Sequence, residues 1–534
     1  MDLNEENIMI NKKLVFILIS ILIIFSFVSL FFIENHSLVA HDESLYANRA
    51  KLIIDTNNWF APFDKAHHKT IGSYWLIALS FKLFGINEFS ARLPSYIFSI
   101  LSSFVLFKII QNISSLRIGL ISFFTLSSSF LWFSYSKYCS PDTIYIFFNL
   151  LSVFYLLKTN NFLKEDVKNK YLFISGLFLS LPFFVRSYLQ LLPLISLFPF
   201  ILFKIKKQSF KNSKYFIIGF FVGLIPLIIY YYISYQIFGV NSLIRPYMLL
   251  HQKTLTENNI FEGFIFYPRN LILLTTPLFI FLLNGSKYIL KNKSREIQLL
   301  LIFTPFINIV ILMFTASKYS HYGLFTIPFL ASNASFGIYE SLKNKSSISK
   351  LTLRIFGGTT LIISTLIILG SILNFHSKIL NPFSLNEGFI ISLLSLISLF
   401  LSLNLRNKNN LKNLNLNKIL SIFFIQIFIL NLLFFNGTIG NPNSDIKNFI
   451  YQTDTKKIIK NNTIFLIGKL GNKNQNLLQF YLPKSKLIQV TEIPKLETIY
   501  AIVSDKDMTQ FNDSIRPNFI NLKEFKNINL VKIN

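Results

Sequence analysis

The chain has 534 residues, of which 52% are hydrophobic, and 60 of them are phenylalanine. Its mean hydropathy of +0.49 excludes an ordinary soluble globular protein and indicates an integral membrane protein. The formal net charge of +27 does not indicate nucleic-acid binding, because the basic residues are spread over loops between apolar runs. The single cysteine, Cys139, excludes an intrachain disulfide and a cysteine-rich metal site.

The apolar runs predict an all-α polytopic membrane domain. The first, residues 14–33, has about twenty residues and lacks a small-residue cleavage site, which favours a retained helix over a signal peptide. Residues 171–203 are too long for one ordinary span, so we expect two helices joined by a tight turn at Arg186 and Ser187. In all we expect about thirteen spans. The others lie near 93–110, 118–135, 142–157, 215–235, 265–284, 297–315, 321–340, 352–374, 387–405 and 419–436.

The loop charges predict the orientation of the chain in an inner or plasma membrane. One set of alternate loops holds 25 Lys and Arg residues, whereas the short loops of the other set hold 6. Because basic loops stay in the cytoplasm, we expect a cytoplasmic N-terminus and an extracytoplasmic C-terminus. All seven histidines then fall on the outer side. Their absence from the cytoplasmic loops is explained equally well if those loops are simply short and rich in Lys and Asn.

The sequence after Asn436 has a different composition. The long apolar runs stop, and short β-like runs such as residues 463–468 and 498–503 alternate with polar segments. We therefore expect a membrane domain over residues 1–436 and a small extracytoplasmic α/β domain over residues 437–534. We find no internal repeat and no glycine-rich nucleotide-binding motif, so direct use of a nucleotide sugar has little support.

A long polar and aromatic stretch, His41 to Pro94, separates the first two apolar runs. It opens with Asp42 and Glu43, and carboxylates beside a bilayer are costly unless they have a function. Asp42 is also a good capping residue for a helix beginning at the following SLYANRAKLII. From the residues alone, the capping and functional interpretations of this acidic pair carry about equal weight.

The order of motifs in this stretch resembles that of the GT-C glycosyltransferases of the protein mannosyltransferase and lipid A aminoarabinose transferase type. The matching positions are Asp42-Glu43, Tyr46-Ala47, Asn58-Trp59 with Pro62, Lys69, Tyr74-Trp75, Phe84-Gly85 and Arg92-Leu93-Pro94. Three departures concern the aminoarabinose transferases in particular: Leu45 replaces an arginine, His68 a glutamate, and Thr70 the proline after the lysine.

Two further segments fit the same resemblance. Pro141-Asp142 matches a common Pro-Asp at an outer loop, although these residues are also typical of a helix start. The segment SKYSHYGLFTIP contains Lys318, His321 and Tyr322 at the expected spacing, although a lysine at a helix mouth is often an interfacial anchor. Arg186 occupies a position where relatives have a Lys-Gly-Pro motif.

The resemblance implies transfer of a sugar from a polyprenyl-phosphate donor to an extracytoplasmic acceptor, which could be lipid A, a glycan, another lipid or a protein. It implies a catalytic loop over residues 34–92 and roles for three groups of residues. The catalytic group is Asp42, Asp142 and Glu43; the donor-phosphate group is Lys69, Lys318 and Arg186; the substrate-binding group is Tyr46, His68, Tyr74, His321 and Tyr322.

Two questions stay open at this point. A polytopic lipid or polysaccharide transporter or flippase is the alternative, but it would be expected to show internal repeats and charges within its helices. The second question is whether a divalent cation is bound: His68, His251 and His321 could supply ligands, yet no spacing matches a metal motif. We expect membrane lipids and the two substrates as partners, and no nucleic acid.

Overall fold

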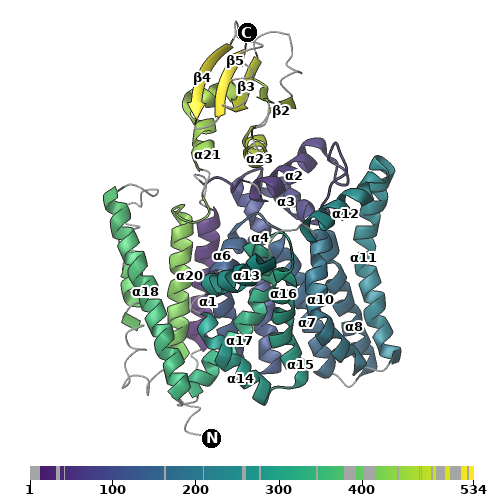
Figure 1. The fold of residues 1–534 in the computed structure, drawn as a ribbon, viewed down its shortest axis with the longest axis vertical. Coiled ribbons are helices and arrows are strands. Elements are labelled where there is room, and N and C mark those ends of the chain that lie inside the picture. Colours follow the sequence, from purple (N-terminus) through teal and green to yellow (C-terminus); the bar gives the residue numbers. More distant parts are fainter. Residues whose placement is uncertain are drawn as a thin grey trace.

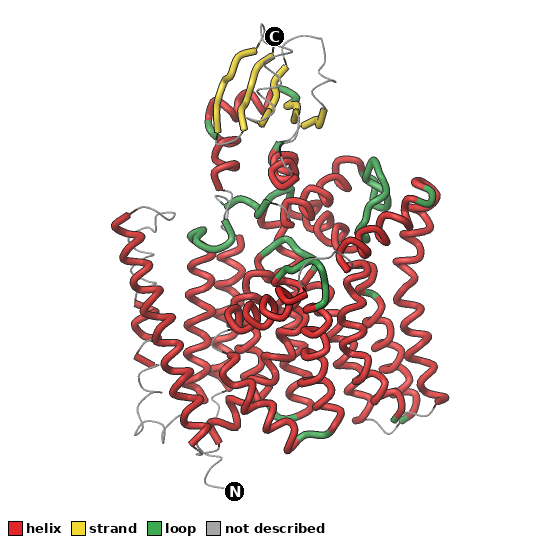
Figure 2. Tube along the Cα trace, in the orientation of Figure 1, coloured by secondary structure: helices red, strands yellow, loops and turns green. Residues whose placement is uncertain are grey.

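The computed structural model of the chain is a bundle of helices with a small β-sheet at one end (Figures 1 and 2). It describes residues 12–31, 36–40, 42–161, 164–207, 210–254, 260–275, 278–343, 347–377, 393–398, 400–401, 416–441, 444–467, 470, 472–482, 485–488, 499–504, 519–525 and 528–533. The first helix, α1 (Lys12–Phe31), begins at the end of the bundle opposite the sheet.

The bundle is formed by long apolar helices with shorter ones between them. Its first half contains α4 (Glu88–Ile113), α5 (Leu116–Ser128), α6 (Phe130–Lys137), α7 (Asp142–Lys158), η2 (Thr159–Asn161), α8 (Glu165–Ser180), α9 (Pro182–Arg186), η3 (Ser187–Gln190), α10 (Leu191–Lys206) and α11 (Phe210–Phe238). Its second half contains α12 (Asn241–Thr254), α13 (Ile260–Thr275), η4 (Leu278–Phe281), α14 (Leu282–Asn292), α15 (Arg295–Gln298), η5 (Leu299–Phe303), α16 (Thr304–Met313), η6 (Ser320–Thr326), α17 (Ile327–Lys343), α18 (Ser347–Ser377) and α20 (Leu416–Phe435).

The chain is a multi-pass membrane protein. Among the described residues, six helical segments are long and apolar enough to cross a membrane, and two bent pairs raise that number to eight. The expected count of about thirteen spans stays a prediction, because the expected span at 387–405 lies largely outside the described residues. The outer helix α11 exposes Ile217, Phe221 and Ile228 by 52–62%, as a surface against lipid tails would.

Small residues bring the helices α8 and α11 into close contact. A Cβ atom at Gly176 would lie 2.1 Å from the carbonyl oxygen of Phe216, and one at Gly219 would lie 2.0 Å from that of Phe173. Each position therefore accommodates only glycine. This is the packing expected in lipid, where close van der Waals contact between backbones replaces hydrophobic driving force.

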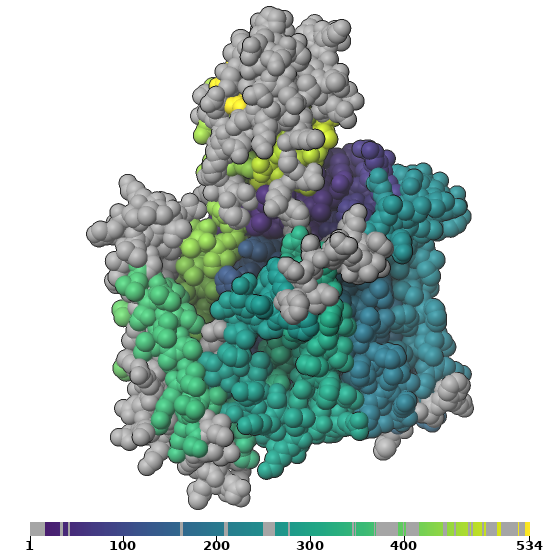
Figure 3. Space-filling view, viewed as in Figure 1, coloured from purple at the N-terminus to yellow at the C-terminus, as the bar shows by residue number. Residues whose placement is uncertain are grey.

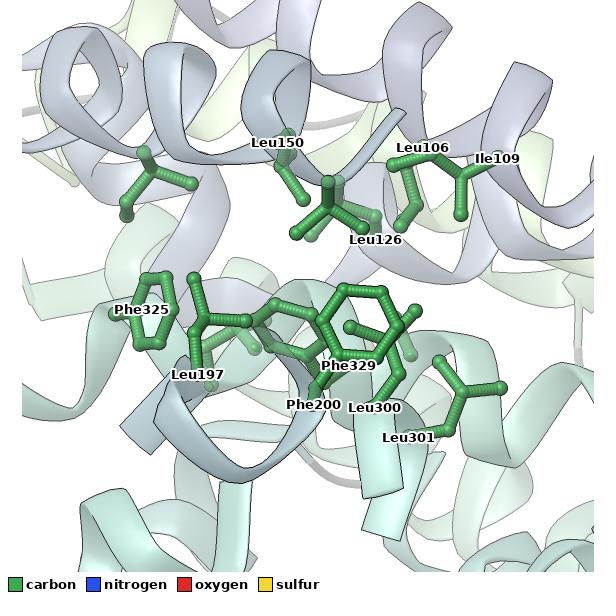
Figure 4. Close-up of a cluster of buried hydrophobic side chains, with 14 of the residues drawn as sticks. Leu106, Ile109, Leu126, Leu150, Leu197, Phe200, Leu300, Leu301, Phe325 and Phe329 are labelled. Carbon is green, nitrogen blue, oxygen red and sulfur yellow. The ribbon is translucent and has the colours of Figure 1, made fainter. Parts of the chain in front are cut away.

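Apolar side chains from several helices fill the interior of the bundle (Figure 4). They project from α4, α5, α7, α10, η5, η6 and α17, and the labelled members of this cluster are Leu106, Ile109, Leu126, Leu150, Leu197, Phe200, Leu300, Leu301, Phe325 and Phe329. The packing of this core fixes the positions of the helix ends. It thereby also fixes the polar side chains that lie at the sheet end of the bundle.

Two helix breaks bring polar segments inward. The pair α5 and α6, expected as one span, bends by 67° around Ser129. The expected turn at Arg186 and Ser187 is present: α9 ends at Arg186, and Ser187 has a left-handed φ of 60° before η3 begins. Such a backbone conformation is uncommon for a residue other than glycine and is often found at functional sites.

Two short helices lie across the sheet end of the bundle, α2 (Asp42–Thr56) and α3 (Gly72–Phe84). They carry the polar stretch between the first two apolar runs. In Figure 1 they lie between the membrane helices and the C-terminal sheet, and Figure 3 shows yellow-green C-terminal residues bordering this purple segment.

The C-terminal region combines helices and a sheet, which matches the expected α/β composition. Its helices are α21 (Ser444–Tyr451), α22 (Thr453–Asn461) and α23 (Asn472–Tyr481), and its strands are β1 (Ile464–Ile467), β2 (Ser485–Ile488), β3 (Ile499–Ser504), β4 (Phe519–Phe525) and β5 (Ile528–Ile533). The strand order is β2-β1-β3-β5-β4. The first three of these strands are parallel, whereas β5 pairs antiparallel with both β3 and β4.

Candidate active site

A buried ion pair between Glu43 and Arg92 fixes the first turn of α2. Nε and Nη2 of Arg92 donate to the two carboxylate oxygens of Glu43 at 2.9 and 2.7 Å. The same oxygens accept from the backbone N–H groups of Val39 at 2.7 Å and Cys139 at 2.6 Å. These four donors occupy the hydrogen-bonding positions of the carboxylate. The contacts therefore assign Glu43 to holding α2 in place, not to the catalytic role expected from sequence.

Asp142 forms a second buried ion pair, with Arg186. Its Oδ1 lies 2.9 Å from Nη2 of Arg186, and both side chains are at most 7% exposed. Its Oδ2 accepts a hydrogen bond of 2.5 Å from the Ser140 hydroxyl, whose oxygen in turn accepts from the Asp142 N–H at 3.1 Å. Asp142 begins α7 and Arg186 ends α9, so this pair joins two helix ends. The ion pair therefore allows Asp142 to orient the guanidinium of Arg186.

Tyr46 connects this ion pair to Lys69. Its hydroxyl oxygen accepts from Nη1 of Arg186 at 2.5 Å and from Nζ of Lys69 at 3.0 Å. The Lys69 ammonium also lies 4.6 Å from the centre of the Tyr46 ring. Two cations are thus held beside one neutral phenol, which does not cancel their charge, and together they form a site suited to an anion.

The loop that carries Lys69 is held tightly against the bundle. The Thr70 hydroxyl donates to the Phe183 carbonyl at 3.2 Å, and the Arg245 guanidinium donates to the Ala66 carbonyl at 2.7 Å. At Gly72 an added Cβ would lie 2.6 Å from the Phe184 carbonyl oxygen, so only glycine lets α3 begin this close to α9. The position of Lys69 is therefore set by its neighbours on both sides.

These side chains line a cavity of about 290 Å³. Its walls come from α2, the loop before α3, the break between α9 and α10, and the segment that starts η6. The lining residues are Leu45, Tyr46, His68, Lys69, Ser73, Val185, Arg186, Ser187, Tyr188, Leu189, Tyr319, His321 and Tyr322. A cavity of this size can hold a sugar phosphate head group.

A smaller cavity of about 100 Å³ adjoins the first. The two share Tyr46, Arg186 and His321 in their linings, and the smaller one also reaches Glu43 and Asp142. The site therefore has two compartments, one lined by cations and tyrosines and one lined by the buried carboxylates.

Asp42, the expected general base, lies outside the residues whose side chains the structure describes. Its backbone forms the first residue of α2. Position 42 is four residues before Tyr46, so the two positions share a face of the helix. Tyr46 lines both cavities, and Ala40 and Glu43 line the smaller one, so position 42 lies in the sequence between residues of the cavity wall.

Comparison with known proteins relates this arrangement to a family. The family of dolichyl-phosphate-mannose-protein mannosyltransferases matches over residues 68–233, which include Lys69, Asp142 and Arg186. An undecaprenyl phosphate-alpha-4-amino-4-deoxy-L-arabinose arabinosyl transferase from Wigglesworthia glossinidia brevipalpis is 29% identical over 35% of each chain. The protein of the same name from Shewanella sediminis is 25% identical over 35% of this chain and 34% of its own. These alignments span about a third of each relative's length.

One solved structure matches almost the whole chain. ArnT from Cupriavidus metallidurans, bound to undecaprenyl phosphate, has a TM-score of 0.76 with 98% of both chains covered and 13% sequence identity. The chain therefore shares the fold of this ArnT. The apo state of the same ArnT gives a TM-score of 0.75. None of these matches supports the transporter or flippase alternative.

Two expected site residues lie outside the described cavities. Tyr74 is fully buried behind Tyr46, with 5.6 Å between ring centres, and its hydroxyl pairs with Nε2 of His67 at 2.9 Å. Burial, with the neighbouring charge of His68 as a smaller cause, lowers the pKa of His67 well below its ordinary value. The pair is therefore neutral support for the Tyr46 ring, and Tyr74 does not have the expected contact with substrate.

Lys318 is the other expected residue outside the described cavities. Its Nζ donates to the carbonyl oxygen of Met313 at 3.0 Å and to that of Thr315. These carbonyls close α16, where backbone acceptors lack partners within the helix and attract a cation. The contacts assign Lys318 to this helix end and not to the donor-phosphate group.

The remaining expected residues meet at the cavity, and the structure adds others. His68, His321 and Tyr322 line it beside Lys69, Arg186 and Tyr46. Tyr188, Ser187 and Tyr319 also line it but were not identified from sequence. Tyr188 and Tyr319 each lie within two residues of a basic residue that was identified, and aromatic neighbours of such cations are the signal that could have found them.

The structure also bears on a metal site. Among the described residues, no group of three or more His, Cys, Asp or Glu side chains is arranged to hold a metal ion. His68 and His321 lie on the wall of one cavity, whereas the side chain of His251 lies outside the description. The geometry therefore offers cationic side chains for an anionic substrate.

Proposed function

We propose that this chain is a membrane glycosyltransferase that moves a sugar from a polyprenyl-phosphate donor to a hydroxyl acceptor on the extracytoplasmic side. The observation that carries this proposal is the convergence of Lys69 and Arg186 on the Tyr46 hydroxyl, at the wall of one cavity. Two positive charges fixed beside a cavity suit the phosphate of a lipid-linked sugar.

The reaction needs a leaving group, a base and a path for one proton. The acceptor oxygen forms a bond to the anomeric carbon, and the bond from that carbon to the phosphate oxygen breaks with both electrons leaving on the phosphate. Lys69 and Arg186 stabilise the negative charge of the departing polyprenyl phosphate. The acceptor proton passes to a carboxylate. The phosphate ester itself carries the activation, so no nucleotide takes part.

Asp42 is the carboxylate proposed as this base. Glu43 is held by Arg92 and two backbone N–H groups, and Asp142 is held by Arg186 and Ser140. Position 42 lies in the sequence between Ala40 and Glu43, which line the smaller cavity. We assign Asp142 the supporting role of orienting Arg186.

The relatives and the loop charges support two further parts of the proposal, the lipid carrier and the orientation in the membrane. Undecaprenyl phosphate is the carrier to test first, because it is bound to the ArnT of similar fold and is named in the relatives. The acceptor could be lipid A, a glycan, another lipid or a protein of the cell envelope. We place the chain in the inner or plasma membrane with its cavity and residues 437–534 on the extracytoplasmic side, in accord with the 25 and 6 basic residues of the two loop sets.

Transfer in proteoliposomes tests the function. The purified chain is supplied with the pool of radiolabelled polyprenyl-phosphate sugars and with an extract of envelope lipids and glycans. We expect label to leave the lipid-linked pool, enter an acceptor fraction and release polyprenyl phosphate. Complete retention of label in the donor pool, with folded wild-type protein, would contradict the proposal.

Asp42→Asn tests the assignment of the base. We expect turnover to fall by roughly 10²–10⁴-fold, the usual contribution of general-base catalysis. Asp55→Asn is the matched control, because Asp55 lies on the same helix and is exposed to solvent. If Asp42→Asn keeps normal transfer, Asp42 caps α2 and the base lies elsewhere.

A further inference from the structure

The helix α2 contacts two parts of the molecule at once. Leu45 and Tyr46 line the larger cavity, whereas Asn48 and Lys51 contact α23 of the C-terminal region. The helix is only 15 residues long and lies between the bundle and the sheet (Figure 1). Any displacement of its outer side is therefore transmitted to Tyr46.

Lys51 closes the C-terminal end of α23. Its ammonium donates to three backbone carbonyls, those of Gln479 at 2.9 Å, Phe480 at 3.2 Å and Leu482 at 3.0 Å. The last carbonyls of a helix have no partners within it and carry partial negative charge, which favours a cation there. Asn48, one turn earlier on α2, donates to the side-chain oxygen of Gln479 at 3.0 Å.

The segment before α2 is attached to the same C-terminal helix. The Tyr481 hydroxyl accepts from the Leu38 N–H at 2.9 Å and donates to Glu88 at 2.8 Å. Lys447 of α21 pairs with Glu88 at 2.5 Å and donates to the His36 carbonyl at 3.0 Å. The C-terminal region thus holds the chain just before α2 as well as the middle of that helix.

We infer that the C-terminal region positions Tyr46, through the contact of Lys51 with the end of α23, so that its hydroxyl meets Arg186 and Lys69 in the donor cavity. Lys51 is in this sense a positioning residue: it lies one turn and one residue beyond Tyr46 on α2 and does not line the described cavities. This inference rests on the proposed transferase function. It gives the C-terminal region a part in donor binding without any contact with the donor.

A change at Lys51 should act on donor binding more than on the chemical step. When α2 shifts, the Tyr46 hydroxyl no longer holds Lys69 and Arg186 together, so the donor phosphate is bound less well. We expect Lys51→Met to raise the donor KM and to lower kcat/KM by roughly tenfold or more, since a misplacement of about 1 Å can cost 10²-fold. Lys51→Arg, which keeps the charge at the helix end, should restore most of the loss.

A double-mutant cycle with Tyr46→Phe separates positioning from general destabilisation. If Lys51 acts through the Tyr46 hydroxyl, Lys51→Met should have little further effect on kcat/KM in the Tyr46→Phe background. Lys457→Met, on the exposed surface of α22, is the matched control and should leave transfer and the melting temperature unchanged. The full-length protein in proteoliposomes, with undecaprenyl-phosphate sugar as donor, is used throughout.

The outcomes are distinguishable. Equal losses from Lys51→Met in the wild-type and Tyr46→Phe backgrounds would overturn the positioning role, as would wild-type kinetics for Lys51→Met. If Lys51→Met does not fold, Asn48→Ala removes the neighbouring contact with Gln479 and is put through the same cycle. Absence of transfer by the wild-type protein would instead count against the proposed function itself.

Discussion

Tyr46 has an unusual role for a tyrosine, because its hydroxyl accepts from two cationic side chains at once. A phenol oxygen can accept two hydrogen bonds without taking up charge. A carboxylate in the same place would neutralise Lys69 or Arg186 and weaken their attraction for phosphate. The tyrosine fixes the distance between the two cations without adding a negative charge, so Lys69, Arg186 and the Asp142 carboxylate paired with Arg186 together keep one net positive charge beside the cavity.

Substitution of these cations tests their role. Lys69→Met and Arg186→Met should each weaken the binding of undecaprenyl phosphate by roughly tenfold or more, the loss expected when a charge-assisted hydrogen bond of about 1.5–3 kcal/mol is removed. Binding can be measured by the ligand-dependent rise in melting temperature. Lys65→Met is the matched control, because Lys65 is exposed in the same loop as Lys69.

Lys318→Met distinguishes the role that the sequence motif predicts for Lys318 from the role that its contacts indicate. The sequence motif predicts weaker binding of the donor phosphate, whereas the contacts with the end of α16 predict unchanged affinity. Unchanged binding by all of the Lys69, Arg186 and Lys318 variants would place the phosphate elsewhere.

The site residues show what a sequence can and cannot reveal. Motif spacing identified Lys69, Arg186 and Tyr46, because they lie in short segments with recognisable neighbours. It misassigned Glu43, since nothing in a sequence shows that Arg92, a separate motif residue, fills its hydrogen-bonding capacity. The role of a charged residue depends on its partner in space, and that partner is set by the fold.

Among the elements, α2 depends on one ion pair for its attachment to the bundle. Arg92 projects from the first turns of α4 and also donates to the carbonyls of Ser37 at 3.1 Å and Gly440 at 3.2 Å. One guanidinium therefore joins α4, the segment before α2, Glu43 and the start of the C-terminal region. Because the pair is buried, removal of one partner leaves an uncompensated charge.

Glu43→Gln should therefore destabilise the protein strongly. We expect a loss of roughly 3–5 kcal/mol, seen as a clear fall in melting temperature in detergent. The double variant Glu43→Leu/Arg92→Met should recover part of this loss, since no charge is left unpaired. Asp64→Asn, at an exposed carboxylate in the loop before α3, is the control. A normal melting temperature for Glu43→Gln would show that water or another anionic group compensates for the lost pair.

Helix position was easier to predict than helix shape. Hydropathy located runs such as 118–135 but could not show the 67° bend at Ser129, because a bend changes direction without changing composition. The break at Arg186 and Ser187 was predictable, since two polar residues interrupt an apolar run that is too long for one span. The contact of α2 with α23 was not, because it depends on residues more than four hundred positions apart.

Over the whole molecule, the two ends of the bundle differ in their chemistry. The end beside the sheet holds the cavity, with Tyr46, Lys69 and Arg186. The opposite end holds Lys204, buried against Glu296 at 3.0 Å, with Lys207 at the surface 3.9 Å from the same carboxylate. The structure therefore places these two lysines at the end opposite the cavity, and the orientation of the two ends across the membrane stays a prediction from the loop charges.

Labelling of single cysteines tests this orientation. The native Cys139 is fully buried, so it should contribute little background to labelling with a membrane-impermeant maleimide. We expect Lys457→Cys, at an exposed position of α22, to be labelled in intact spheroplasts, because the loop charges predict a C-terminal region outside the cytoplasm. Lys207→Cys, at a side chain that is 53% exposed, should be labelled only after the membrane is permeabilised. The wild-type chain is the control. Labelling of Lys207→Cys but not Lys457→Cys in intact spheroplasts would put the cavity on the cytoplasmic side, and an extracytoplasmic transfer reaction would then be excluded.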